Sequence, residues 1–92
     1  GLGGRTAAIV AKKLEELAGH YQVIVISHSP QIASRAADHF QIQKHEVAGR
    51  VITGVARLTE DEREMEIARM LAGEKVTESA RINARELLKP AS

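Results

Sequence analysis

The 92-residue sequence contains no cysteine and only two aromatic residues, Tyr21 and Phe40. The absence of cysteine excludes disulfides and thiolate metal sites, and it fits a reducing, cytoplasmic location. Two aromatic rings are too few to stack successive bases, which argues against an autonomous single-strand binder. The apolar residues, 43% of the chain, are therefore expected to form a core of aliphatic side chains.

An excess of charge of one sign is also missing, because 13 Lys and Arg residues nearly balance 12 Asp and Glu residues. This balance excludes a strongly basic nucleic-acid tail. The longest apolar runs, residues 7–11 and 23–26, are far too short to cross a bilayer, so no membrane partner is expected. No signal peptide is predicted either. The chain starts at Gly1 rather than at Met, and we expect it to be a piece of a longer polypeptide.

The first half of the chain has the pattern of a wound α/β sheet. Apolar residues recur at helical spacing over residues 5–18, and Gly19 supplies a stop. Residues 22–27 form a β-branched run without alternation, which predicts a strand buried on both faces, as in a parallel sheet. Residues 29–37 begin with Ser-Pro, an N-cap followed by a proline at the first helical position, and predict a short helix.

The second half predicts a hairpin and two helices. Residues 40–58 contain two extended runs separated by a turn near Gly49. Residues 59–72 start with the spacing of a capping box and an acidic first turn, which predicts a helix. A last helix is predicted over residues 78–89. No repeat or linker interrupts the pattern, so residues 1–92 are interpreted as one domain.

Three polar residues, Ser27, His28 and Ser29, follow the predicted strand. In open α/β sheets, ligands bind beyond the carboxyl ends of the strands, where helix N-termini converge. An imidazole at this place can donate to a phosphate oxygen or hold an attacking water. The structural alternative is that His28 only hydrogen-bonds a neighbouring loop. The other three histidines lack such a context, and their spacing does not resemble a zinc site, so no metal ligands are predicted.

The opening Gly1-Leu2-Gly3-Gly4 precedes the first predicted helix, where backbone amides can approach an anion. A simple tight turn is an equal alternative. A dinucleotide site needs a carboxylate at the end of the next strand, and this strand ends in Ser-His instead. That difference argues against a nicotinamide or flavin enzyme.

The sequence has no phosphate loop of the form G-x-x-x-x-G-K-[ST] and no acidic pair at a strand end for magnesium. The chain by itself therefore cannot hold a triphosphate. The acidic residues in 60–66 are interpreted as a solvated helix start. Arg81 and Arg85 lie one helical turn apart, and a surface role is favoured over phosphate binding.

Five segments of the chain match a known family in their order and spacing. They are residues 1–7, 23–33, 38–40, 68–73 and 84–88. Together they resemble the end of the ATPase head of the RecN family of bacterial DNA-repair proteins, which is similar to SMC proteins and, more distantly, to ABC-type ATPases. The resemblance covers essentially the whole chain. It implies an α/β fold, the C-terminal lobe of a P-loop (ABC/SMC-type) ATPase head, with a parallel-sheet strand, flanking helices and a β-hairpin.

The resemblance also implies roles for two sites. Gly1, Leu2, Gly3 and Gly4 match the D-loop, which lies at the interface between two heads that sandwich ATP. His28 matches the switch histidine, which contacts the γ-phosphate and helps to organise hydrolysis. The family's phosphate loop, Q-loop, signature motif and Walker B carboxylates have no counterpart in this chain. Most ligands of ATP and Mg²⁺ are therefore expected to come from an upstream part.

The implied function is to complete an ATP-driven head that acts in double-strand-break repair and recombination. The expected partners are the N-terminal lobe of the same head, a second head in an ATP-dependent dimer, and DNA through the intact protein. The expected location is the bacterial cytoplasm, at the nucleoid. On its own the chain is expected to be inactive. Two rivals are a non-catalytic protein-interaction module and, less favoured, a dinucleotide-dependent enzyme.

Overall fold

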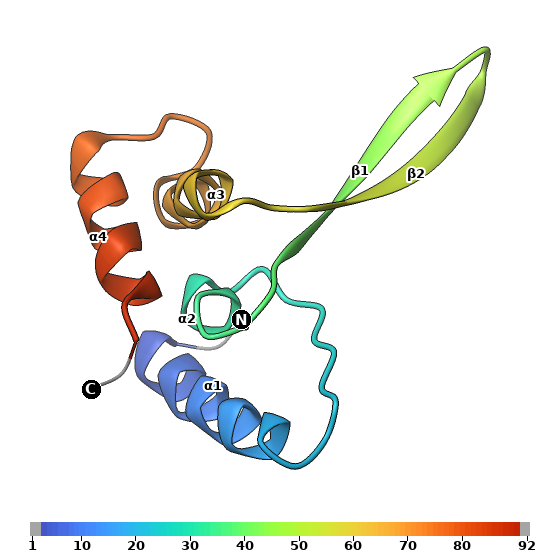
Figure 1. Cartoon of the computed structure of the whole chain (residues 1–92). Coiled ribbons are helices and arrows are strands. Elements are labelled where there is room, and N and C mark those ends of the chain that lie inside the picture. The colour runs from blue at the N-terminus through green and yellow to red at the C-terminus, as the bar shows by residue number, and fades with distance from the viewer. Residues whose placement is uncertain (1–2, 91–92) are drawn as a thin grey trace.

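The structure, a computed structural model, describes residues 3–90 as four helices and one β-hairpin. In chain order these elements are α1 (Gly4–Ala18), α2 (Pro30–Ala33), β1 (Phe40–Val47), β2 (Arg50–Arg57), α3 (Glu60–Ala72) and α4 (Glu78–Leu88). The helices gather on one side, and the hairpin extends away from them (Figure 1). The extents of the molecule, 48 × 35 × 26 Å, reflect this elongated arrangement.

The core is small and lies between α3 and α4. Ile67 and Ala68 of α3 are buried against Ala80 and Ala84 of α4. Ile67 is the one large side chain in residues 3–90 that is fully buried. The other three buried core positions are alanines, and larger side chains that are only partly buried, such as Leu71 and Leu87, pack around them.

Side-chain caps define the starts of α3 and α4. The Thr59 hydroxyl accepts from the Glu62 N–H at 3.2 Å, and the Glu62 carboxylate accepts from the Thr59 N–H at 2.9 Å. This reciprocal pair is the predicted capping box. At the start of α4, the Thr77 hydroxyl accepts from the Ala80 N–H at 3.1 Å. These bonds satisfy backbone donors that the helices leave unpaired, and they confirm both predicted starts.

The predicted hairpin is also confirmed. β1 and β2 pair antiparallel along their whole length, with Phe40 opposite Arg57. The two turn residues, Ala48 and Gly49, have φ angles of 51° and 77°. Positive φ at both central residues is the conformation that matches the twist of a two-residue hairpin.

The predicted strand over residues 22–27 is not formed. This segment has no regular secondary structure, and within residues 3–90 the β1–β2 pair makes up the sheet. Ile24 and Ile26 are 84% and 91% exposed rather than buried. A strand is stabilised by hydrogen bonds to a neighbouring strand, and the described chain brings none beside this segment. Residues 3–90 therefore do not form the expected parallel sheet.

The helix at residues 30–37 is shorter than predicted, because α2 ends at Ala33. Its start is as expected, since the Ser29 hydroxyl accepts from the Ile32 N–H at 3.4 Å. Further carbonyl groups that a longer helix would use accept instead from Arg63 of α3. Beyond the C-cap of α2, the backbone makes hydrogen bonds between residues only three apart, and Arg63 supplies further donors to these carbonyls.

Candidate functional site

The starts of α1 and α2 lie next to each other. A Cβ added to Gly4, the first residue of α1, would lie 3.5 Å from the Nε2 atom of Gln31 in α2. Gln31 follows His28 by three residues, so the structure brings the end of the glycine segment close to the loop that carries the histidine. Gly3 is the N-cap of α1. Gly1 and Leu2, the rest of the predicted D-loop, lie outside the described residues.

His28 lies directly before the cap of α2 and is exposed. The backbone N–H of Ser29 donates to the Ser27 hydroxyl at 3.0 Å, and the Ser29 hydroxyl donates to the Gln31 side chain at 3.1 Å. These hydrogen bonds hold the turn around His28 through its neighbours. The exposed imidazole can therefore meet a ligand that approaches from outside.

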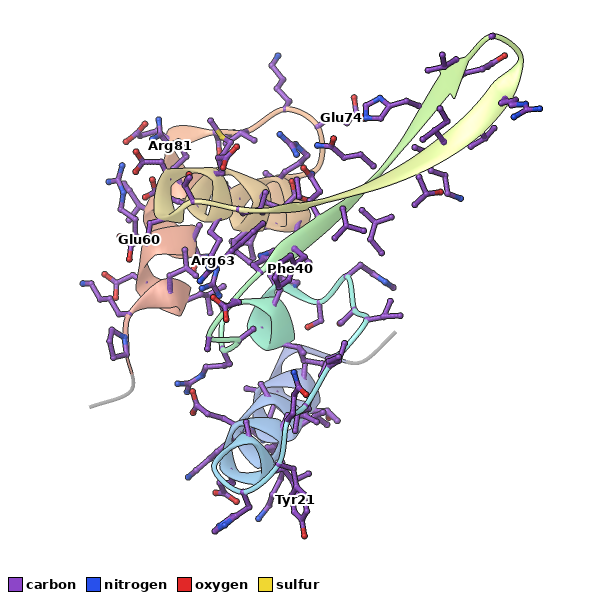
Figure 2. The ribbon with its side chains drawn as sticks, turned by 45° about the vertical axis from the view of Figure 1, so that its right-hand side comes forward. Tyr21, Phe40, Glu60, Arg63, Glu74 and Arg81 are labelled. Carbon is purple, nitrogen blue, oxygen red and sulfur yellow. The ribbon has the colours of Figure 1, made fainter. Side chains whose placement is uncertain are left out.

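The other end of α2 is held by one side chain of α3. The Nη2 atom of Arg63 donates to the carbonyl oxygens of Ala36, Ala33 and Ser34 at 2.8, 3.1 and 3.5 Å. Its Nη1 atom donates to the carbonyl of Ala37 at 3.4 Å. Figure 2 shows Arg63 between α3 and the region of α2. One guanidinium thus serves four carbonyl groups within residues 33–37.

Sequence reasoning missed Arg63, although one signal pointed to it. Arg63 is a cation at the start of a helix, directly after three acidic residues that suit the positive end of the helix dipole. Burial lowers the pKa of Arg63, and the nearby carboxylates of Asp38 and Glu60 oppose that effect. A half-buried cation in the first turn of a helix, where anions are favoured, indicates that specific acceptors hold it there. The backbone carbonyls of residues 33–37 are those acceptors.

Two acidic side chains of α3 have structural partners. Glu64 pairs with Arg81 at 3.5 Å and with Arg85, both on α4. Glu66 accepts from the Gln41 side chain of β1 at 3.0 Å. The interpretation of the acidic run as solvated is therefore wrong for Glu64 and Glu66, which tie α3 to α4 and to the hairpin. The two arginines, for which a surface role is expected, thus form ion pairs across the α3–α4 contact.

His39 lies at the base of the hairpin, between α2 and β1. Its Nδ1 atom is buried and has no hydrogen-bond partner within the described chain. Burial lowers the pKa of His39, the charge of Arg63 lowers it further, and Glu66 raises it. The folded chain therefore favours the neutral imidazole more than the unfolded chain does.

The lowered pKa of His39 predicts a pH dependence of stability. Its ordinary value is 6.5, so below that pH the unfolded chain takes up a proton at His39 more readily than the folded chain. The free energy of unfolding is expected to fall as the pH drops through 6.5 and to level off below the folded-state pKa. Urea unfolding between pH 7.5 and 5.5 measures this effect.

His39→Gln is expected to flatten that slope, whereas His45→Gln in the exposed part of the hairpin is expected to preserve it. Glu62 of the capping box does not contribute to this slope. Its pKa is lowered from an ordinary value of 4.5, so its effect on stability falls below the pH range of the experiment. If the slope were unchanged in His39→Gln, the pH dependence of stability could not be assigned to His39.

Comparison with known proteins adds to this geometry. No family model matches the chain. The chain is 46% identical over 88 residues to the DNA repair protein RecN of Halalkalibacterium halodurans, and 48% identical over 88 residues to that of Deinococcus radiodurans. With RecN of Bacillus subtilis it shares 41% identity over 91 residues. This chain is related to RecN. The resemblance expected from five segments of the sequence is confirmed.

The match covers 96% of this chain in the first two RecN proteins and 99% in the third. It covers only 15–16% of the RecN proteins themselves, so the chain spans about one sixth of the relatives that it matches. The similarity is to the C-terminal part of RecN. A match of this extent spans His28, α2 and Arg63. Within residues 3–90, no helix has both the length and the apolar character needed to span a membrane.

Proposed function

We propose that the chain is the C-terminal lobe of an ATPase head in a RecN-like protein of bacterial DNA repair. The observation that carries the proposal is the identity of 40–48% with RecN over nearly the whole chain. The mixture of helices and strands fits such a lobe. The activity follows from the family resemblance, and the intact protein would act at the nucleoid in double-strand-break repair and recombination.

In this proposal His28 contacts the γ-phosphate of ATP and helps to organise hydrolysis. Its support in the structure is the exposed ring on a turn that the Ser29 hydrogen bonds already hold. An imidazole in this position donates a hydrogen bond to charge that develops during phosphoryl transfer. His28 is thus the residue of this chain that acts on the nucleotide.

The glycine segment would serve as the D-loop at the interface with a second head. The position of Gly4 supports this role, because it lies at the start of α1 within van der Waals reach of Gln31 in α2. Within residues 3–90 there is no cluster of three or more acidic or histidine side chains that could hold a metal ion. The ligands of Mg²⁺ and most of the phosphate contacts are therefore assigned to the N-terminal lobe of the same head.

Residues 22–27 would join a parallel sheet of that N-terminal lobe. The support is their β-branched sequence together with the exposure of Ile24 and Ile26. Burial of such side chains against a neighbouring strand is favourable by about 25 cal/mol for each Å² removed from water. Contact with the rest of the head would thus supply the partner that this strand lacks here.

The proposal predicts that the 92-residue chain alone does not hydrolyse ATP. When it is mixed with the N-terminal part of a RecN protein, we expect a complex with ATPase activity, measured by phosphate release and by sedimentation. His28→Ala in the same mixture is the matched control and should form the complex without comparable turnover. Turnover by the isolated chain, above that of its His28→Ala variant, would contradict the proposal. A complex in which neither version hydrolyses ATP would favour the protein-interaction module, which the exposed apolar side chains also suit.

A further inference from the structure

We infer that Arg63 is the positioning residue for His28, because its guanidinium fixes the segment that anchors the histidine loop. This inference rests on the proposed function of His28. It assigns to α3 a task in ATP hydrolysis that is separate from nucleotide contact.

The first support is the number and kind of the Arg63 contacts. Four backbone carbonyls, those of Ala33, Ser34, Ala36 and Ala37, accept from its two terminal nitrogens at 2.8–3.5 Å. The planar guanidinium carries five N–H donors in a fixed fork, a shape that can bridge several carbonyls at once. Its Nε is buried and has no partner within the described chain, so the bonding of this group is concentrated on residues 33–37.

The second support is the short path from these carbonyls to His28. α2 has only four residues, and His28 lies two positions before its first one. On the other side of His28, residues 22–27 have no regular structure and pair with no strand of the described chain. The position of His28 in this structure therefore depends on α2 and on whatever holds α2.

The third support is the rigidity of the element that carries Arg63. α3 is buried against α4 through Ile67, and Glu64 adds ion pairs to Arg81 and Arg85. This places Arg63 on a helix that the core of the chain anchors. The carbonyls that it binds belong to residues 33–37, where the last two backbone hydrogen bonds join residues only three apart. The hydrogen bonds of Arg63 thus connect the α3–α4 core to α2, which directly follows the loop of His28.

Loss of Arg63 is expected to loosen this segment without unfolding the chain. Ala33 of α2 still packs against the α3–α4 core, and the Ser29 cap does not involve Arg63. Displacement of a catalytic group by about 1 Å can lower turnover by about 10²-fold. The effect should therefore fall on kcat for ATP hydrolysis, with little change in KM.

The test uses a full-length RecN protein that carries this chain as its C-terminal segment. Arg63→Gln is expected to lower kcat by about 10- to 100-fold. Arg63→Lys keeps the charge but lacks the planar fork, and it should lie between Arg63→Gln and the parent. Arg50→Gln, at the exposed start of β2, is the matched control and should keep the parent kcat. The backbone amides of residues 34–38 should exchange hydrogen faster in Arg63→Gln than in the parent, and Arg50→Gln should show no such change.

A double-variant cycle with His28→Ala separates positioning from other roles. If Arg63 acts through His28, Arg63→Gln should cause little further loss of kcat once His28 is absent. If the double variant instead loses kcat by the product of the two single-variant factors, the inference is overturned. Parent kcat in Arg63→Gln would also overturn it, as would, if that variant fails to fold, parent kcat in a folded Arg63→Lys variant. Parent kcat in His28→Ala would instead overturn the proposed function of His28, whichever result Arg63 gives.

Discussion

Replacing His28 with alanine in a full-length RecN protein that carries this chain is expected to lower ATP turnover by about 10²–10³-fold. The change removes a hydrogen bond that strengthens as charge develops on the transferred phosphoryl group. ATP affinity should fall much less, because most ground-state phosphate contacts are assigned to the N-terminal lobe. Turnover at saturating ATP and nucleotide binding measure the two effects separately.

The fold should survive this substitution, since the turn is held by the Ser29 hydrogen bonds rather than by the imidazole. His45→Ala, which removes an exposed imidazole from the hairpin, should leave turnover unchanged. Full turnover by a folded, ATP-saturated His28→Ala protein would refute the catalytic role. Joint loss of folding and ATP affinity would instead indicate that His28 is structural.

Replacing Ile67 with alanine is expected to lower the free energy of unfolding by about 2–5 kcal/mol. The side chain is fully buried between α3 and α4, so its truncation leaves a cavity that the surrounding side chains fill only in part. A chain of this size has about 5–15 kcal/mol of stability in total, so the loss is a large fraction of it. Urea unfolding followed by helical circular dichroism measures the change.

Ile67→Val should cost only about 0.5–1.5 kcal/mol, because it removes a single methylene. Ile9→Ala, on the exposed side of α1, should change stability by no more than about 0.5 kcal/mol. If Ile67→Ala unfolded at the parent urea concentration, the assigned core would be wrong.

Local signals in the sequence predicted the helices and the hairpin well. The caps of α3 and α4 are hydrogen bonds between residues three positions apart, and the turn at Ala48 and Gly49 depends on two neighbouring φ angles. Such contacts can be read from short stretches of sequence.

The failures all involve distant partners. The β-branched run over residues 22–27 predicts a strand, but a strand forms only where another chain segment completes its hydrogen bonds. Arg63 reaches carbonyls 26–30 residues earlier, and Glu64 reaches an arginine 21 residues later. No short-range pattern contains that information. For the same reason the sequence could nominate His28 but could not show what holds its loop.

The two-stranded hairpin has a consequence for handling the chain. Within residues 3–90 no third strand borders β1 or β2, so each strand has an outer row of backbone N–H and C=O groups without a ladder partner. Such rows are templates for the addition of a strand from another molecule, and a lone pair of strands is only marginally stable in water. Lys44 and Glu46 near the tip oppose that addition through charge and hydration. Concentrated solutions of the chain are therefore exposed to edge-to-edge association through the hairpin.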